Sequence, residues 1–171
     1  MKRLIFTLLL FASSVAGAKA QTTYKKVENV EVLDLYGKPA VLPEFGKKNL
    51  MIFYVDPDRA RQNHEFTVEL EENKLAEGEN LLGFGVMNLK DAPMIPNGLA
   101  RMMARARTKK NKALILSDQD RVISREWDLG DCNNNFIIML INREGEILFM
   151  SRGELTEEEK TEFYRVLKDL V

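Results

Sequence analysis

The sequence predicts an α/β protein in which a mixed sheet carries helices on both faces. Apolar runs of strand length alternate with helical patterns through most of the chain, an order typical of that class. The last third adds a hairpin signal and then a capped amphipathic helix, which predicts antiparallel strands at one side of the sheet. The runs that look like buried strands are Leu50–Val55, Asn80–Leu89 and Ala113–Leu116.

Residues 1–20 have the pattern of a secretory signal peptide. Lys2 and Arg3 precede the apolar run Leu4–Phe11, and Ala18-Lys19-Ala20 provides the small residues of a cleavage site. The apolar run is too short to span a bilayer, which takes roughly 20 residues. We therefore expect an exported protein whose mature part, residues 21–171, is one domain.

The charge balance excludes one class of function. The chain has 25 basic and 26 acidic residues, and removal of residues 1–20 takes away Lys2, Arg3 and Lys19 but no acid. The mature net charge is then −4, without the basic footprint that general nucleic-acid binding needs. With a single cysteine, no disulfide can form within the chain.

The first half of the mature chain predicts two strands joined by a turn, a core strand and a helix. Alternation in Val27–Leu35 is β-like, Tyr36–Pro39 is a turn signal, and Ala40–Leu42 can return as a short strand. After Leu50–Val55, the pattern favours a helix from about Arg59 to Ala76.

The second half predicts two further helices, a hairpin and a terminal helix. Leu99, Met102, Met103 and Ala106 form a helical stripe that we expect to face inward, and residues 119–128 favour a short helix ending near Trp127. Asn142–Gly145 joins two strands, Phe136–Ile141 and Glu146–Met150. Thr156 and Glu159 form a capping box at the start of the last helix, whose apolar face is Phe163, Val166, Leu167 and Leu170.

This order and several motifs resemble the thioredoxin-like superfamily. The stretch from Asp34-Leu35-Tyr36-Gly37-Lys38 through Phe45-Gly46-Lys47 to Phe53-Tyr54 is similar to its peroxiredoxin and periplasmic thiol-oxidoreductase branches. Residues 94–155 resemble more closely the YtfJ family of small exported proteins. The shared elements are Ile95-Pro96-x-Gly98, a Lys-rich helix end, Trp127-x-Leu129, Glu144-Gly145 and Gly153-x-Leu155-Thr156-x-Glu158-Glu159.

The resemblance implies a thioredoxin-like sandwich and a periplasmic location, but no particular activity. Redox-active members of the superfamily carry C-x-x-C where this chain has Asp58-Arg59-Ala60-Arg61. The YtfJ family also lacks that pair. We therefore expect a non-redox protein, more a binding or interaction module than an enzyme, with no cofactor.

The loop around residues 56–64 is the first candidate site. Asp56, Asp58, Arg61 and His64 could bind a cation or another ligand. The simpler interpretation, which we favour, is that Asp58 caps a helix and pairs with Arg61. One histidine with two acids is a weak signal for a metal, so we predict no metal site.

Cys132 is the second candidate, because a lone exported cysteine could serve a thiol enzyme that works with an external thiol, or pair between chains. Its neighbour Asp131 raises a thiol pKa. Arg61 could oppose that effect only if the two loops face each other. An unreactive thiol is the interpretation that we favour.

The stretch 101–112 is basic and contains no acid. With the apolar stripe inward, Arg101, Arg105 and Lys109 would form an outer face able to touch anionic lipid, a polyanion or an acidic partner. Such runs are more often solvated surfaces. The partner expected overall is a periplasmic protein or small ligand, with at most weak contact to an anionic surface.

Overall fold

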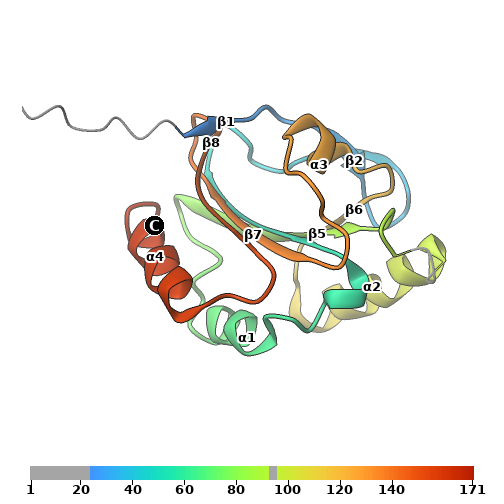
Figure 1. The fold of residues 1–171 in the computed structure, drawn as a ribbon. Coiled ribbons are helices and arrows are strands. Elements are labelled where there is room, and N and C mark those ends of the chain that lie inside the picture. Colours follow the sequence, from blue (N-terminus) through green and yellow to red (C-terminus); the bar gives the residue numbers. More distant parts are fainter. Residues whose placement is uncertain (1–23, 93–95) are drawn as a thin grey trace, which may run out of the picture.

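The computed structural model describes residues 24–92 and 96–171, and these form an eight-stranded mixed sheet in the order β1-β8-β7-β4-β5-β6-β2-β3 (Figure 1). The strands are β1 (Lys25–Lys26), β2 (Glu31–Leu33), β3 (Pro39–Val41), β4 (Asn49–Val55), β5 (Leu81–Asn88), β6 (Ile115–Asp118), β7 (Phe136–Ile141) and β8 (Glu146–Arg152). The helices are a 3-10 turn η1 (Pro57–Arg59) and α1 (His64–Glu72), α2 (Asn97–Asn111), α3 (Val122–Glu126) and α4 (Glu157–Lys168).

β4 lies at the centre of the sheet, parallel to β5 and antiparallel to β7. Its Ile52 pairs with Phe84 on one side and with Met139 on the other. All six residues of β7 are buried, which explains why its sequence is continuously apolar rather than alternating.

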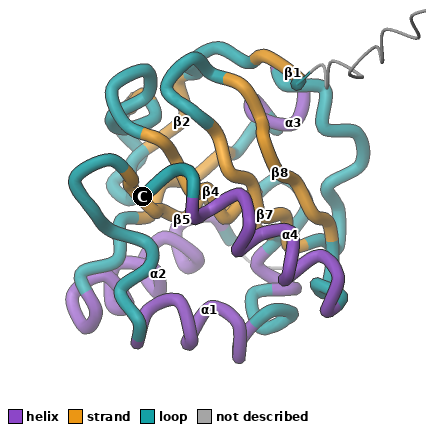
Figure 2. The backbone as a smooth tube through the Cα atoms, turned by 90° about the vertical axis from the view of Figure 1, so that its left-hand side faces the viewer, coloured by secondary structure: helices purple, strands orange, loops and turns teal. Residues whose placement is uncertain are grey.

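Successive side chains of the central strands enter two separate cores. Ile137 and Met139 of β7 pack with Trp127, beside α3, whereas Ile138 and Leu140 pack with Phe163 of α4. Figure 2 shows the corresponding layers, with α1 and α4 on one side of the strands and α3 on the other. The predicted mixed sheet with helices on both faces is confirmed.

Two predicted elements in the first half are longer than those observed. Only Glu31–Leu33 of the predicted strand 27–35 is a strand. The helix predicted over 59–76 is limited to η1 and to α1 at 64–72. Asn63, just before α1, uses its side chain to bond Gly153 and Leu155, so it serves the tertiary structure instead of continuing a helix.

The last third follows the prediction closely. β7 and β8 form the expected hairpin around Asn142–Gly145, and the capping box of α4 is present, with Glu159 N donating to Thr156 Oγ1 at 3.2 Å. Burial of Phe163, Val166, Leu167 and Leu170 confirms the predicted face of the terminal helix.

The predicted orientation of α2 is wrong. Ala100 and Ala104 are its buried residues, whereas Leu99, Met102 and Met103 are 44%, 53% and 61% exposed. The helix approaches the body through its small alanines and through two arginines that find acceptors there. Arg101 and Arg105 therefore face the protein, and the apolar stripe faces outward.

The predicted signal peptide, residues 1–20, lies outside the described residues. Within residues 24–92 and 96–171, no helix has both the length and the apolar character needed to cross a membrane.

Candidate functional site

The loop after β4 is held by a buried carboxylate, that of Asp56. Asp56 is 1% exposed, and its Oδ1 accepts from Asp58 N at 2.9 Å while Oδ2 accepts from Asn134 N at 2.7 Å. Asp56, not Asp58, therefore caps the 3-10 turn, which corrects the sequence-based prediction. The same carboxylate joins this turn to the loop that precedes β7.

Further hydrogen bonds fasten this region to the loops in front of β7 and after β8. Asp56 N donates to Asn135 O at 3.0 Å, and Gln62 Oε1 accepts from Phe136 N at 3.0 Å. Asn63 donates to Gly153 O at 2.7 Å and accepts from Leu155 N at 3.0 Å. The loop after β4 and the loop before β7 therefore face each other, which is the condition stated above for Arg61 to affect Cys132. These hydrogen bonds hold both loops in place.

An open hollow of about 450 Å³ lies where these loops meet, lined by Asp58, Arg59, Arg61, Gln62 and Asn134. The side chains of Asp58 and Arg61 line it together, but the described residues contain no ion pair between them, contrary to prediction. Arg59 and Arg61 are exposed.

His64 is exposed at the first position of α1 and is not among the residues that line this hollow. The described parts of the chain contain no group of three or more His, Cys, Asp or Glu side chains arranged to bind a metal ion. Both oxygens of Asp56 are already engaged by backbone amides, so Asp58 is the acid of this loop that remains open to a ligand.

Cys132 lies in the core rather than in the hollow. It is 3% exposed, packs in the cluster that contains Tyr54 and Trp127, and donates its thiol hydrogen to Gly130 O at 3.5 Å. Burial raises the pKa of the Cys132 thiol, and Arg152 opposes that effect only in part. These properties weigh against a thiolate at neutral pH.

The cation beside Cys132 is Arg152, not Arg61. Arg152 Nη1 lies 4.0 Å from Cys132 Sγ, and the guanidinium also donates to the carbonyl oxygens of Asp131 and Leu129. The hairpin register pairs Ile137 with Arg152, two residues beyond the predicted end of the second strand, so the sequence-based prediction did not include this arginine.

A buried polar cluster that sequence reasoning missed lies under α3. Asp118 is 1% exposed, and its carboxylate accepts from Val122 N and Ile123 N, both at 2.9 Å, and from Tyr54 Oη at 3.2 Å. Burial, with the Asp118 charge, raises the pKa of Tyr54 and keeps it protonated. The cluster holds the start of α3 against the sheet.

An ion pair lies beside this cluster. Asp91, with only 2% of its side chain exposed, accepts from Arg121 Nε at 2.7 Å and from Asn88 Nδ2 at 2.5 Å. The Asp91 carboxylate raises the pKa of Arg121. Asn88 Oδ1 is buried without a hydrogen-bond partner among the described residues.

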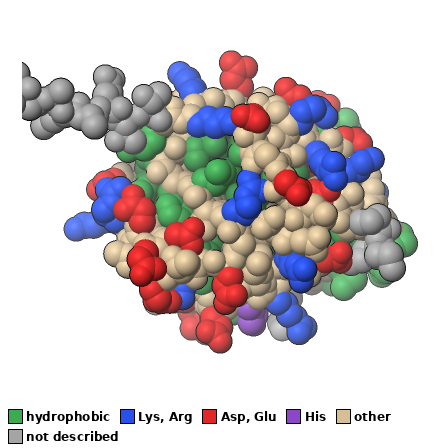
Figure 3. Space-filling model, in the orientation of Figure 1, with side chains coloured by type: hydrophobic (Ala, Val, Ile, Leu, Met, Phe, Trp, Pro, Cys, Tyr) green, Lys and Arg blue, Asp and Glu red, His purple; other side chains and the backbone are tan. Residues whose placement is uncertain are grey.

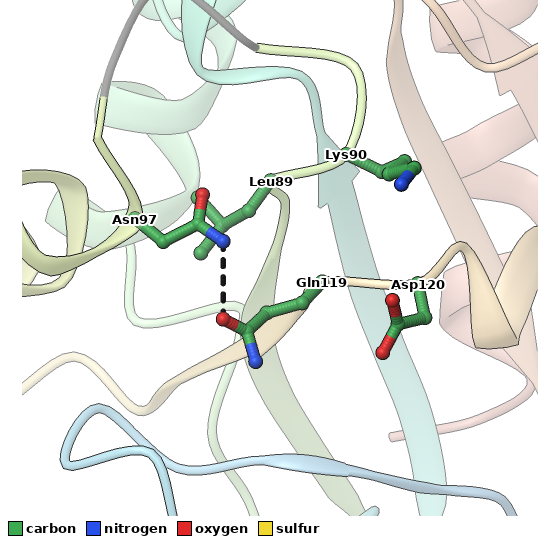
Figure 4. A pocket seen from close by; sticks show the side chains of 5 residues that line it. All are labelled: Leu89, Lys90, Asn97, Gln119 and Asp120. Atoms are coloured by element: carbon green, nitrogen blue, oxygen red, sulfur yellow. Dashed lines mark hydrogen bonds between the residues drawn. The ribbon is translucent and has the colours of Figure 1, made fainter.

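A second hollow, of about 460 Å³, opens at the carboxyl ends of the parallel strands β5 and β6. Figure 4 shows Asn97 pointing toward Gln119, whose Oε1 accepts from Asn97 Nδ2 at 3.0 Å, while Lys90 projects away from that bond. The carboxyl ends of neighbouring parallel strands are a common ligand position, and that rule could have drawn attention to this place.

The predicted anionic-partner residues of α2 are separated by the structure. Arg101 Nη1 donates to Gln119 Oε1 at 2.9 Å, and Arg105 Nη1 donates to Leu35 O at 2.5 Å with its guanidinium 5.4 Å from the centre of the Tyr36 ring. Lys109 is exposed. Arg101 and Arg105 thus serve to attach the helix, and only Lys109 stays on the outer surface as expected.

No family model matches the sequence, and no curated protein matches it closely enough to count as a relative. Solved structures do match, over most of both chains. A protein of Bacteroides thetaiotaomicron proposed to be a protein disulfide isomerase is 18% identical, with a TM-score of 0.60 over 85% of this chain and 87% of that one. A thiol:disulfide interchange protein of the thioredoxin family from Chlorobium tepidum is 12% identical, with a TM-score of 0.58 over 88% and 99%.

A peroxidoxin from Mycobacterium tuberculosis is 15% identical, with a TM-score of 0.54 over 86% of this chain and 95% of that one. The chain has the thioredoxin-like fold. At these identities the likeness concerns the backbone, and it confirms the thioredoxin-like fold that the resemblance implied. Within this thioredoxin-like chain, the facing loops at Asp56–Gln62 and Asp131–Asn135 contain one cysteine, and that cysteine is buried.

Proposed function

We propose that this chain is an exported, non-redox thioredoxin-like protein that acts as a binding module in the periplasm, of the YtfJ type. The observation that carries the proposal is the composition and bonding of the loop after β4. It has no cysteine, and its buried Asp56 binds the backbone of the facing loop through Asn134. Two-cysteine exchange needs a thiol pair at such a place, and this chain has none.

The motif residues that suggest the YtfJ type have structural roles here. Trp127 Nε1 donates to Glu28 O at 2.8 Å, and Leu155 is buried. Gly145 has a φ of +79°, and a Cβ there would lie 2.5 Å from Val27 O. Such residues support a shared architecture in which no motif supplies a nucleophile.

The hollow between the two loops is the binding place that the geometry favours. Arg59 and Arg61 are exposed there beside Asp58 and the amide groups of Gln62 and Asn134. Fixed loops lower the ordering cost of binding, since the site is largely formed before the ligand arrives. We infer a polar or anionic group on a small ligand or protein partner.

Two alternatives have distinct signatures. A single-cysteine enzyme would act through Cys132 with an external thiol, which requires the buried thiol to become accessible. A cation-binding protein would use the 56–64 loop, where Asp58 is the acid still open to a ligand. A thermal shift on adding Ca²⁺ or Zn²⁺ that disappears in Asp58→Ala would favour the second alternative.

Insulin reduction with dithiothreitol, for the wild type and Cys132→Ser, tests the proposal. We expect both proteins to give the background rate. Activity in the wild type that is lost in Cys132→Ser would favour the thiol enzyme. Activity that survives the substitution would overturn the whole argument, because no other cysteine is present.

A further inference from the structure

The outward side of α2 carries an exposed apolar stripe. Leu99, Met102 and Met103 are 44%, 53% and 61% exposed, and Ala106 is exposed beside them. Residues at spacings of three and four share one helix face, so these four form a continuous strip. Figure 3 shows hydrophobic side chains at the surface in the region of α2.

Basic residues lie along both sides of the strip, which we call the α2 stripe (Leu99, Met102, Met103 and Ala106). With 3.6 residues per turn, Arg107 and Lys109 lie about 80° to either side of Leu99. Arg107 and Lys109 are exposed. Arg107 Nη2 lies 3.6 Å from Glu71 Oε1 of α1, and the side chains of Arg107 and Glu71 are each about half exposed. The helix itself and its cap, residues 97–112, contain no acid.

We propose that the α2 stripe docks on an anionic lipid surface. An apolar strip with basic flanks on one helix is the arrangement of helices that lie in a membrane interface, apolar side down and cations at the headgroups. Charge complementarity selects the anionic surface, because the exposed flanks of the stripe, Arg107 and Lys109, are cationic. Methionine side chains adapt readily to such a boundary.

The alternatives fit less well. A two-fold contact between copies would place the same basic flanks against each other, which opposes association. A protein partner would need a groove for this convex strip, whereas a bilayer surface accepts it without one. This proposal is independent of the proposed binding hollow between the 56–62 and 131–135 loops, because no residue of α2 lines that hollow.

Co-sedimentation with vesicles tests the proposal. Equal mixtures of phosphatidylcholine and phosphatidylglycerol are compared with phosphatidylcholine alone, using the mature chain. We expect binding to the anionic vesicles that weakens with salt. Met103→Glu should abolish it, whereas Val41→Glu, at a side chain of nearly equal exposure (60%) on β3, should leave it intact.

A charge pair separates electrostatic from apolar contributions. Lys109→Glu should weaken binding by about fivefold or more, since each basic residue near an anionic surface is worth about 1 kcal/mol. Lys26→Glu, an equal charge change on β1, should have little effect.

Equal binding by Met103→Glu and Val41→Glu would overturn the proposal. Binding to the phosphatidylcholine vesicles but not to the anionic vesicles would also overturn it. A dimer in solution that Met103→Glu disrupts would do the same. The insulin assay result is unaffected by any of these outcomes.

Discussion

Among single residues, Asp56 has the greatest influence on the loops that form the candidate site. One buried carboxylate satisfies the amides of Asp58 and Asn134, two residues far apart in the sequence. Nothing in the local sequence distinguishes it from Asp58, which also follows the strand. Its partner Asn134 is supplied by a turn nearly 80 residues away, so only the fold could reveal its role.

Asp56→Ala should destabilise the protein by roughly 2–4 kcal/mol, because two backbone amides lose the carboxylate that accepts their hydrogen bonds. Asp56→Asn should cost about half as much, since one amide oxygen can still accept. The free energy of unfolding in urea measures both. Asp58→Ala is the control, exposed and without this double contact; if it were as damaging as Asp56→Ala, the proposed role of Asp56 would be wrong.

Cys132 provides a prediction about pH. Because burial raises its pKa above the usual 9.0, the folded state favours the protonated thiol. Its contribution to stability is therefore fully present below 9.0 and is lost as the pH rises above that value. The stability difference between the wild type and Cys132→Ala should stay constant at neutral pH and shrink above 9.0.

Alkylation of Cys132 gives a second readout of the same burial. Iodoacetamide should modify the native protein roughly tenfold or more slowly than the urea-unfolded protein, since the thiol is both protonated and covered. Labelling at equal rates in the two states would show that the thiol is accessible and would revive the thiol-enzyme alternative.

At the scale of elements, α2 shows where a sequence pattern misleads. Its Leu and Met residues recur at helical spacing, which correctly predicted a helix, but the pattern does not say which side is covered. Acceptors for Arg101 and Arg105 come from Gln119 and Leu35, on other elements. Tertiary hydrogen bonds and the small Ala100 and Ala104 therefore decided the orientation, and neither is visible in a local window.

The elements predicted best are those whose signals are local. The Asn142–Gly145 turn and the box at Thr156 depend on residues within a few positions, and both are confirmed. The start of α1 was misplaced because Asn63 bonds to Gly153 and Leu155, about ninety residues away. Two residues that line the hollow, Asp58 and Arg61, were predicted from the sequence, whereas the contribution of Asn134 depends on the fold.

The start of β5 provides a test of close packing between elements. Gly83 N donates to Ala76 O at 2.6 Å, and a Cβ on Gly83 would lie 2.7 Å from both the Cβ and the carbonyl oxygen of Ala76. Gly83→Ala should lower the free energy of unfolding by about 1–3 kcal/mol, because backbone must move to admit the methyl group. Gly78→Ala, with nothing within 4 Å, should be close to neutral in the same urea titration.

At the scale of the whole molecule, β7 joins the two cores, because neighbouring side chains on one strand point into opposite layers. Ile137 packs with Trp127, and Ile138 packs with Phe163 across the sheet. The sheet class could be predicted from alternating strands and helices, but the division of β7 between two cores could not, since a continuous apolar run has no alternation to read.

Ile138→Ala should destabilise the protein by about 2–5 kcal/mol and should shift the Trp127 fluorescence transition as far as the far-UV circular dichroism transition. Ile137→Ala, in the same core as Trp127, is the comparison. If Ile138→Ala moved the circular dichroism midpoint but left the fluorescence midpoint unchanged, the two layers would unfold separately.

The outermost strands, β1 and β3, have a consequence for the behaviour of the chain in a crowded compartment. β1 has two residues, both exposed lysines, and β3 has three and begins with Pro39. Short, charged or proline-bearing edges offer few free amides and carbonyls to an incoming strand, so they resist edge-to-edge aggregation. A sheet of eight strands can therefore remain dispersed at high concentration, although its central strands are almost wholly apolar.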